Sequence, residues 1–407
     1  MATLLLTGFW FITQVVNPAS HRLTHGFSAY YTASRLLRQG EISHKIYEPD
    51  YFRPLVRTAS RQQTSDIYNA NPPTMSLMFW PLSFLSVERA RIVWTWANAL
   101  MLWTGLVVLI LALVERPTLF TVVPVLSLGM LFQPALANIK FGQAYLLIFL
   151  LLTVAVVAWL KRSDGLGGTA LAITILLKAV GWMLIPLLLY QRRWRFLAST
   201  LAVLMGILLL TFPYLPGPMW PRYLVLLLET VKSPITCVTA YQTTRSLLCH
   251  LFVFDQAWNS QPLVHLPWLA SGLFAVLAIG TLVVIYWLNK INEYLAIMSV
   301  LVWILIFAPL GEQHHHTIML IPITYILVNW QSKILDPAVG KVCAAVAIAA
   351  YLVPFQIGHT RFHDGWWALL AYPRVYSAWL ILVALCSPLL MYHNPRFLYR
   401  RLFKVVH

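Results

Sequence analysis

The stretch "IVWTWANALMLWTGLVVLILALV", residues 92–114, decides the fold of this chain. It is almost entirely apolar and is long enough to cross the hydrocarbon core of a bilayer, for which a helix needs about 20 residues. Residues 145–160, "YLLIFLLLTVAVVAWL", have the same character, and such runs recur from end to end of the sequence. Counting about twelve of them predicts an all-α polytopic membrane protein with one integral membrane domain over residues 1–407.

The composition agrees with this prediction. Of the 407 residues, 59% are hydrophobic and 10% are charged, and the mean hydropathy is +0.72. A soluble domain carries about 25% charged residues, so that class is excluded. The net charge of +16 would suit nucleic acid, but the basic residues are scattered over short loops and the C-terminal segment. This pattern anchors a membrane protein, so we expect the lipid bilayer as partner and no nucleic acid.

The N-terminal segment and the cysteines give little information about function. The opening "MATLLLTGFWFITQVV" has no basic n-region and no small-residue cleavage site, so it predicts a retained first span. The four cysteines have no metal-binding spacing and indicate no function: Cys237, Cys249, Cys343 and Cys386.

The topology follows from placing the short basic loops in the cytosol. Two of these loops, residues 161–165 and 191–195, are separated by enough apolar sequence for one span, which would put them on opposite sides. Two short spans that meet near Lys178 and Gly181 keep both loops inside. The sequence therefore predicts a broken hairpin with Lys178 at its outer tip.

The first loop, residues 17–90, is then extracytoplasmic. It is predicted to contain an amphipathic helix from about Ser28 to Gln39, closed by Gly40, and a turn at residues 48–50. Residues 71–85 are apolar but short and contain prolines at both ends, which predicts a helix lying on the outer interface. The basic residues of this loop suit an anionic lipid or a phosphate-bearing ligand.

This topology brings the polar residues of the apolar segments to the outer face. We expect one functional site there, on a multi-pass protein of the plasma membrane. Lys178 either binds an anion or extends its ammonium to the membrane surface, and Arg245 either clamps a phosphate or anchors its loop. Amide and ammonium groups at residues 138–143 either line the site or touch the substrate. The expected substrate-binding residues in these segments are Asn138, Lys140, Gln143, Lys178 and Arg245.

The segment "EQHHH", residues 312–316, invites a metal site, because imidazole is a common zinc ligand. Adjacent residues on a helix fan out by roughly 100°, so three histidines in a row cannot face one ion, and we predict no metal. A helix N-terminus that favours an anion is the preferred alternative, and Glu312, His314 and His316 are expected to bind the substrate there. On an α-helix Glu312 shares a face with His315 and His316 and can orient an imidazole. The histidines otherwise lie at a wet interface.

Asp66 precedes a segment rich in turn residues, "SDIYNANPPT", just before the interfacial helix. Its carboxylate would therefore lie at the membrane surface and face the site. The alternative is a local role in an Asx turn or as a helix cap.

The order of these motifs resembles glycosyltransferase family 87. The resemblance is in "FSAYYTASRLL", "NPPTMSLMFWPLSFL", "FGQAYLLIFLLL", "LLKAVGWMLIPLLLYQRRWR", "YQTTRSLL" and "APLGEQHHHTIMLIP", over about residues 25–330. It implies a C-type glycosyltransferase architecture, an active-site acid in the extracytoplasmic first loop, and a polyprenyl-phosphate sugar as donor. The family has an Asp directly before the Phe of "FSAYY", where this chain has Gly26.

The absent acid leaves two interpretations. Another carboxylate of the loop has taken its role, with Asp66 first and Glu41 or Asp50 after it, or the protein has lost transferase activity. The family's His-His pair is matched by the histidine run in two registers, and His315 is common to both.

The resemblance and the residues together predict an inverting glycosyltransferase that needs no cofactor. It would move a mannose- or arabinose-like sugar from a polyprenyl phosphate to a glycolipid or glycan acceptor at the outer face. Asp66 would take the acceptor proton, and His315, Lys178 and Arg245 would stabilise the departing phosphate. The alternative is a non-catalytic binder or carrier of an anionic polyprenyl-phosphate lipid.

Overall fold

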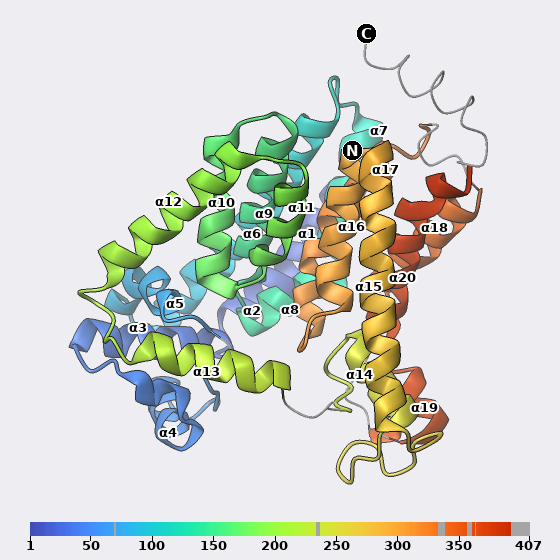
Figure 1. Cartoon of the computed structure of the whole chain (residues 1–407). Helices are drawn as coiled ribbons and strands as arrows, with labels where there is room; N and C mark the ends of the chain where they lie inside the picture. The colour runs from blue at the N-terminus through green and yellow to red at the C-terminus, as the bar shows by residue number, and fades with distance from the viewer. Residues whose placement is uncertain (69–70, 233–236, 333–337, 356–359, 363, 392–407) are drawn as a thin grey trace. The chain divides into compact units, whose positions relative to one another are not determined.

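The computed structural model describes residues 1–68, 71–232, 237–332, 338–355, 360–362 and 364–391. Over these residues the secondary structure is mainly helical, and an isolated β-bridge joins Asp255 to Asn259 (Figure 1). The chain divides into two compact units. The first contains Met1–Thr236 and Pro309–Ile321, and the second contains Cys237–Ala308 and Pro322–His407.

Four helical segments of the described chain are long and apolar enough to cross a membrane: α6 (Val87–Leu113), α12 (Trp194–Thr211), α15 (Pro267–Ile291) and the segment Pro373–Leu390, which comprises α20 (Pro373–Cys386) and most of η8 (Ser387–Met391). A fifth candidate is the pair α7 (Leu119–Leu131) and α8 (Gln133–Phe141), which is bent by 48°. Pro134 lies at this bend, near the start of α8. Proline donates no backbone hydrogen bond, which accounts for the change of direction.

Shorter apolar helices occupy much of the remaining sequence: α9 (Tyr145–Leu160), the run Gly181–Tyr190, α16 (Glu293–Ile306) and α18 (Ala338–Leu352). The structure therefore has the apolar helices of a membrane protein. The count of about twelve spans is larger than the number of helices that pass the length test, so that count stays a prediction.

The first unit begins with α1 (Ala2–Trp10), the π-helical η1 (Phe11–Val16) and α2 (Asn17–Ser20). The residues at both junctions have right-handed helical dihedral angles, so the three elements follow one another as one helical segment. This segment lies where the sequence predicts the first span.

The first loop forms α3 (Phe27–Gln39), η2 (His44–Tyr47), α4 (Pro49–Ala59), α5 (Thr74–Met78) and η3 (Trp80–Phe84). Helix α3 ends at Gly40 with a φ of 74°, as the sequence predicts. The turn expected at residues 48–50 is wrong, because Pro49 begins α4 instead. Proline fits the first position of a helix, where its missing N–H has no partner to lose.

The broken hairpin is confirmed. Helix α10 (Asp164–Lys178) ends at Lys178, Ala179 has a left-handed φ of 47°, and η4 (Gly181–Leu184) leads into α11 (Ile185–Tyr190). A Cβ on Gly181 would lie 2.7 Å from the side chain of Leu171, so the returning chain packs directly on α10.

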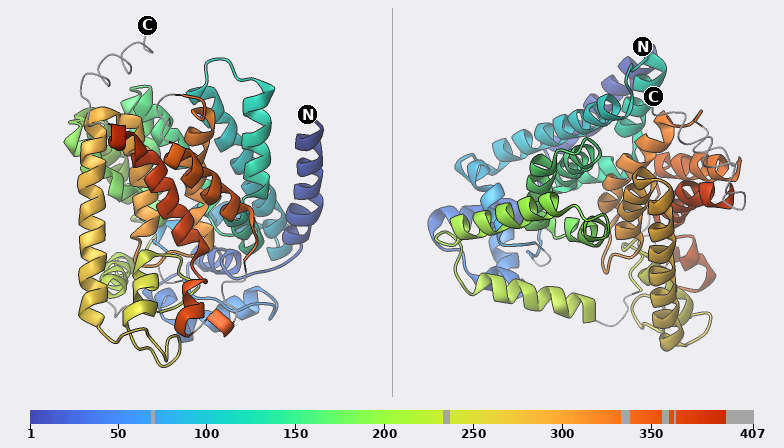
Figure 2. Two further views of the ribbon diagram at one scale, coloured as in Figure 1. Left: turned by 90° about the vertical axis from the view of Figure 1, so that its right-hand side faces the viewer. Right: turned by 45° about the horizontal axis from the view of Figure 1, so that its top comes forward.

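The two loops at the base of this hairpin lie side by side. Trp159 Nε1 donates to Gln191 Oε1 at 2.8 Å, and Arg193 forms an ion pair with Asp164. Both basic loops are thus at the same end of the hairpin, as two short spans require. Helix α13 (Met219–Lys232) completes this part of the unit and runs across the direction of α9 and α10, with Tyr223 against Tyr47 of the first loop (Figures 1 and 2).

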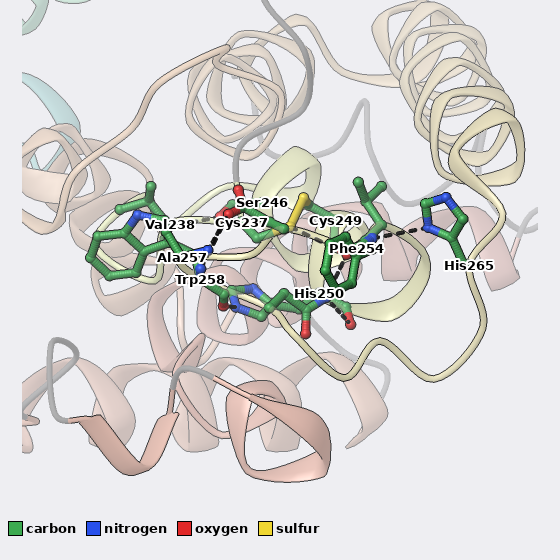
Figure 3. The surroundings of a disulfide bond; sticks show 12 residues. Cys237, Val238, Ser246, Cys249, His250, Phe254, Ala257, Trp258 and His265 are labelled. Atoms are coloured by element: carbon green, nitrogen blue, oxygen red, sulfur yellow. Dashed lines mark hydrogen bonds between the residues drawn. A yellow bond between two sulfur atoms is a disulfide. The ribbon is translucent and has the colours of Figure 1, made fainter.

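The second unit also contains α14 (Thr244–Phe252), η7 (Thr360–Phe362), α19 (Gly365–Leu369) and, from Pro322 on, α17 (Leu320–Val328). A disulfide joins Cys237 to Cys249 and ties the start of this unit to α14 (Figure 3). The sequence indicates no function for the cysteines, and the structure adds a structural bond between these two. Their separation of 12 residues matches no motif, and only the fold brings them together.

Candidate active site

The Asp66 carboxylate lies against Gly26. The backbone N–H of Gly26 donates to Oδ2 of Asp66, and the N–H of Ile67 donates to Oδ1 at 2.8 Å. The second bond is local, whereas the first joins residues 40 positions apart. Asp66 therefore does more than form a local turn: its carboxylate lies beside the position where the family-like pattern has an aspartate.

Residue 26 must be glycine in this conformation. Its φ is 84°, a value that residues with a Cβ rarely adopt. A Cβ there would lie 2.6 Å from Nε2 of Gln143 and 3.0 Å from the carbonyl oxygen of Phe141. An aspartate cannot occupy this position unless the backbone or Gln143 moves.

Gln143 and Tyr30 connect the first loop to the end of α8. The Tyr30 hydroxyl, on α3, donates to Oε1 of Gln143 at 2.6 Å. Tyr30 is buried, with 1% of its surface exposed. The same Gln143 thus lies against Gly26 and accepts the Tyr30 hydrogen bond, so these three residues connect the start of α3 to the segment after α8.

Lys178 is the last residue of α10, and neutral groups hold it. Its Nζ donates to Oδ1 of Asn71 at 2.6 Å and lies 5.5 Å from the ring centroids of both Tyr30 and Tyr145. Asp66 and Glu312 act on it electrostatically, but neither forms an ion pair with it in the described part of the chain. An ammonium donates three hydrogen bonds, so Lys178 retains capacity for an anionic ligand.

The histidine run forms η5 (Gln313–Met319), a 3₁₀ segment, rather than the start of an α-helix. Glu312 precedes it in an extended conformation, and its Oε2 lies 3.5 Å from Nδ1 of His314. The expectation that Glu312 orients His315 or His316 is therefore wrong. That expectation assumed α-helical spacing, which the extended Glu312 and the tighter 3₁₀ turn do not have.

The Tyr145 ring contacts two of the histidines. Its ring stacks on His315 with centroids 4.1 Å apart and lies 5.3 Å from the His314 ring. His316, by contrast, is fully buried. The arrangement places His314 and His315 beside Lys178, with Tyr145 shared between them.

Burial sets the charge of this segment. Burial lowers the pKa of His314 well below its ordinary value, with the Lys178 ammonium next in effect. The pKa of His315 is also well below the ordinary value, because of burial and then His314. Both imidazoles are therefore neutral at pH 7. Burial raises the pKa of Glu312, Lys178 opposes that rise, and Asp66 adds to it.

The remaining expected site residues have other surroundings. Asn138 is fully buried: its Nδ2 donates to Oδ1 of Asn98, and its Oδ1 accepts the N–H of Tyr145, each at 2.8 Å. Lys140 is exposed, with its Nζ 5.5 Å from the Phe141 ring centroid. Arg245 is half-buried on α14 in the second unit, so its part in the site stays a prediction.

Sequence reasoning missed three groups that the structure places here: Tyr30, Asn71 and Tyr145. Each lies within a quoted motif, but a tyrosine or asparagine among apolar residues gives no sign of its partner. No group of three or more His, Cys, Asp or Glu side chains that could hold a metal ion occurs among the described residues.

Comparison with known proteins supports the assignment that the motifs suggest. The family model of glycosyltransferase family 87 matches residues 69–310, which is more than half of the chain and includes Gln143 and Lys178. Asp66 and the histidine segment flank this range. No curated protein and no solved structure matches the chain. The chain belongs to glycosyltransferase family 87 and is a membrane glycosyltransferase by family.

Proposed function

We propose that this protein is an inverting, polyprenyl-phosphate-sugar-dependent hexosyl- or pentosyltransferase, with Asp66 as its general base. The observation that carries the proposal is the hydrogen bond from Gly26 N–H to Asp66. It puts a carboxylate beside the position of the absent family aspartate, with the Lys178 ammonium in electrostatic reach. This placement favours a relocated base over the alternative of a non-catalytic lipid binder.

The proposed step needs few groups. Asp66 takes the proton of an acceptor hydroxyl while that oxygen bonds to the anomeric carbon from the face opposite the phosphate. The bond between the anomeric carbon and the phosphate oxygen breaks, and its electron pair stays on the polyprenyl phosphate. A general base contributes about 10²- to 10⁴-fold to such a step.

Lys178 is the group we assign to the phosphate. Its position among neutral partners means that an arriving phosphate need not displace a carboxylate. The neutral His315, stacked on Tyr145, offers a ring N–H to the same phosphate. Hydrogen bonds from charged donors to a charge that develops in the transition state are among the strongest catalytic contacts.

Glu312 adjusts the charge of the site. With both histidines neutral, Asp66 and Glu312 would outweigh Lys178, and an anionic donor would be repelled. The raised pKa of Glu312 favours its protonated form, which removes one negative charge. We therefore propose that the donor binds when Glu312 carries a proton.

The proposal includes the location and the partners. We propose about twelve spans, a plasma-membrane location and an extracytoplasmic site, with a mannose- or arabinose-like donor and a glycolipid or glycan acceptor. The Cys237–Cys249 disulfide supports this orientation, because it lies in a segment that the charge pattern puts outside, and disulfides persist in oxidising compartments.

The test uses purified protein with radiolabelled polyprenyl-phosphate mannose and, separately, the arabinofuranose donor, offered with membrane glycolipids. Wild type should form product, and Asp66→Asn should bind donor but form almost none. The matched control is Asp50→Asn, an exposed carboxylate in the first turn of α4, which should retain activity. Tight donor binding without product from wild type, across a range of acceptors, would favour the lipid-binding alternative.

A further inference from the structure

We propose that Arg91, a buried arginine near the start of α6, is a positioning residue that holds together the two segments that support the Asp66 carboxylate. This proposal rests on the proposed function for its effect on turnover. Its structural content, the placement of Gly26 and Gln143, is testable without any activity.

Arg91 is fully buried, and its guanidinium contacts two segments far apart in sequence. Its Nε donates to the carbonyl oxygens of Ala19 and Arg22, each at 3.0 Å. Its NH2 group donates to the carbonyl oxygens of Ile139 and Lys140 at 3.0 and 2.9 Å. One side chain thus binds the end of α2 and the end of α8.

These carbonyls lie just before the groups that matter in the site. Gly26 follows Arg22 by four positions, and Gln143 follows Lys140 by three. Thr24 lies between Arg22 and Gly26 and donates to the Phe141 carbonyl oxygen at 3.0 Å. The two segments therefore also contact each other directly. Any shift of Arg91 is therefore passed to the Gly26 N–H that holds Asp66.

Neighbouring groups pack closely around the Arg91 guanidinium. The guanidinium lies 5.4 Å from the Phe27 ring centroid. A Cβ on Gly142, whose φ is 66°, would lie 2.0 Å from the NH1 atom of Arg91. Trp94, one turn further along α6, donates to the Gly142 carbonyl oxygen at 2.9 Å. Both α6 side chains therefore fix the residue that precedes Gln143.

The chemistry requires arginine. No carboxylate pairs with Arg91 among the described residues, so its charge is stabilised by carbonyl oxygens at helix C-termini, where the helix dipole favours a cation. A planar guanidinium donates in several fixed directions, whereas the lysine ammonium is a point charge on a flexible stem. Lysine donates from a single nitrogen, so it cannot reproduce the separate Nε and NH2 groups with which Arg91 binds the two segments.

The test compares Arg91→Lys with Arg374→Lys. Arg374 is an equally buried arginine, in the second unit, that also donates to backbone carbonyls, those of Ala350 and Val353, and lies 5.7 Å from a tyrosine ring. Both variants lose packing of a buried cation. Only Arg91→Lys should affect the site.

Two measurements are made on both full-length variants. A catalytic group misplaced by about 1 Å can lose about 10²-fold in rate, so kcat of Arg91→Lys should fall by 10- to 100-fold while the donor KM stays within about twofold. Hydrogen exchange of peptides that cover residues 24–30 should be faster in Arg91→Lys than in wild type or Arg374→Lys. If both variants lose kcat equally, or exchange at residues 24–30 is unchanged, Arg91 has no positioning role. Absence of turnover in wild type would instead refute the proposed function, and the exchange result would still decide the role of Arg91.

Discussion

Two groups of polar side chains inside this protein are built differently. In the second unit, the Tyr372 hydroxyl contacts Ser246 Oγ at 3.0 Å and His250 Nδ1, while His250 Nε2 lies 3.0 Å from the Trp258 carbonyl oxygen. All three side chains are at most 2% exposed. In the first unit, Asp66, Lys178 and Glu312 influence one another electrostatically without forming ion pairs among themselves.

The difference indicates a structural role for the group around Tyr372 and a chemical role for the group around Asp66. A buried polar group is usually satisfied by its neighbours, and the network around Tyr372 follows that rule. Charges held near one another but unpaired are costly, and such groups concentrate at functional sites. Hydrogen-bond saturation therefore distinguishes the two groups better than burial does, and substitutions in them should affect different quantities.

The largest expected effect comes from removing the base. Asp66→Asn should lower kcat by about 10²- to 10⁴-fold while donor binding is retained, because the amide cannot take the acceptor proton. The counterpart in the second unit is Tyr372→Phe, which leaves two buried partners without the hydroxyl to which they hydrogen-bond. This substitution should cost about 1–3 kcal/mol of stability with kcat unchanged. Initial rates and thermal unfolding midpoints check both. Loss of activity in Tyr372→Phe would show that the Tyr372 network contributes to turnover and is not only structural.

Restoring the family aspartate should harm the protein. Gly26→Asp places a Cβ against Gln143 in a backbone conformation that favours glycine, which costs on the order of 1–3 kcal/mol, and it displaces the N–H that holds Asp66. Turnover should fall by about 10²-fold, as expected for a misplaced catalytic group. The matched control is Gly165→Asp, since no atom lies within 4 Å of a Cβ there. Higher turnover in Gly26→Asp would show that Asp66 is not the base.

The phosphate contact should give a smaller effect. Lys178→Met retains the length of the side chain and removes the charge, so donor KM should rise by about 10- to 100-fold, equivalent to the 1.5–3 kcal/mol of a hydrogen bond to a charged group. The exposed Lys161, at the end of α9, serves as the control, and Lys161→Met should change KM by less than about threefold. Initial rates at varied concentrations of polyprenyl-phosphate mannose measure KM for both variants. Equal KM values for wild type and Lys178→Met would remove Lys178 from the site.

The sequence predicts features that depend on local spacing. The apolar stripe closed by Gly40 predicts α3, and two basic loops that must lie on the same side of the membrane predict the broken hairpin at Lys178. Features that depend on tertiary contacts are not predictable from one sequence. Nothing local indicates that Gly26 N–H meets Asp66, or that Cys237 meets Cys249. The pairing of Glu312 was wrongly predicted because the helix type was assumed.

Donor affinity should also depend modestly on pH through Glu312. Burial raises the pKa of Glu312 above its ordinary value of 4.5, so its proton is retained to higher pH than that of a free glutamic acid. Donor affinity should be highest with Glu312 protonated and should fall as pH rises through its pKa in the folded protein, because ionisation adds a negative charge beside the phosphate. Isotherms for polyprenyl-phosphate mannose without acceptor, at pH values from about 4 to 8, measure this.

Glu312→Gln separates the Glu312 proton from the other titratable groups nearby. The charges that act on Glu312 are Lys178 and Asp66, His25 acts on the adjacent His314, and burial lowers the pKa of His314 well below its ordinary value. The sugar phosphodiester carries one negative charge throughout. Glu312→Gln imitates the protonated acid, so it should bind donor at high pH as wild type does at low pH. A fall in affinity with pH that persists in Glu312→Gln would assign the proton to another group, and a flat wild-type profile would mean that the site tolerates both carboxylates beside the donor phosphate.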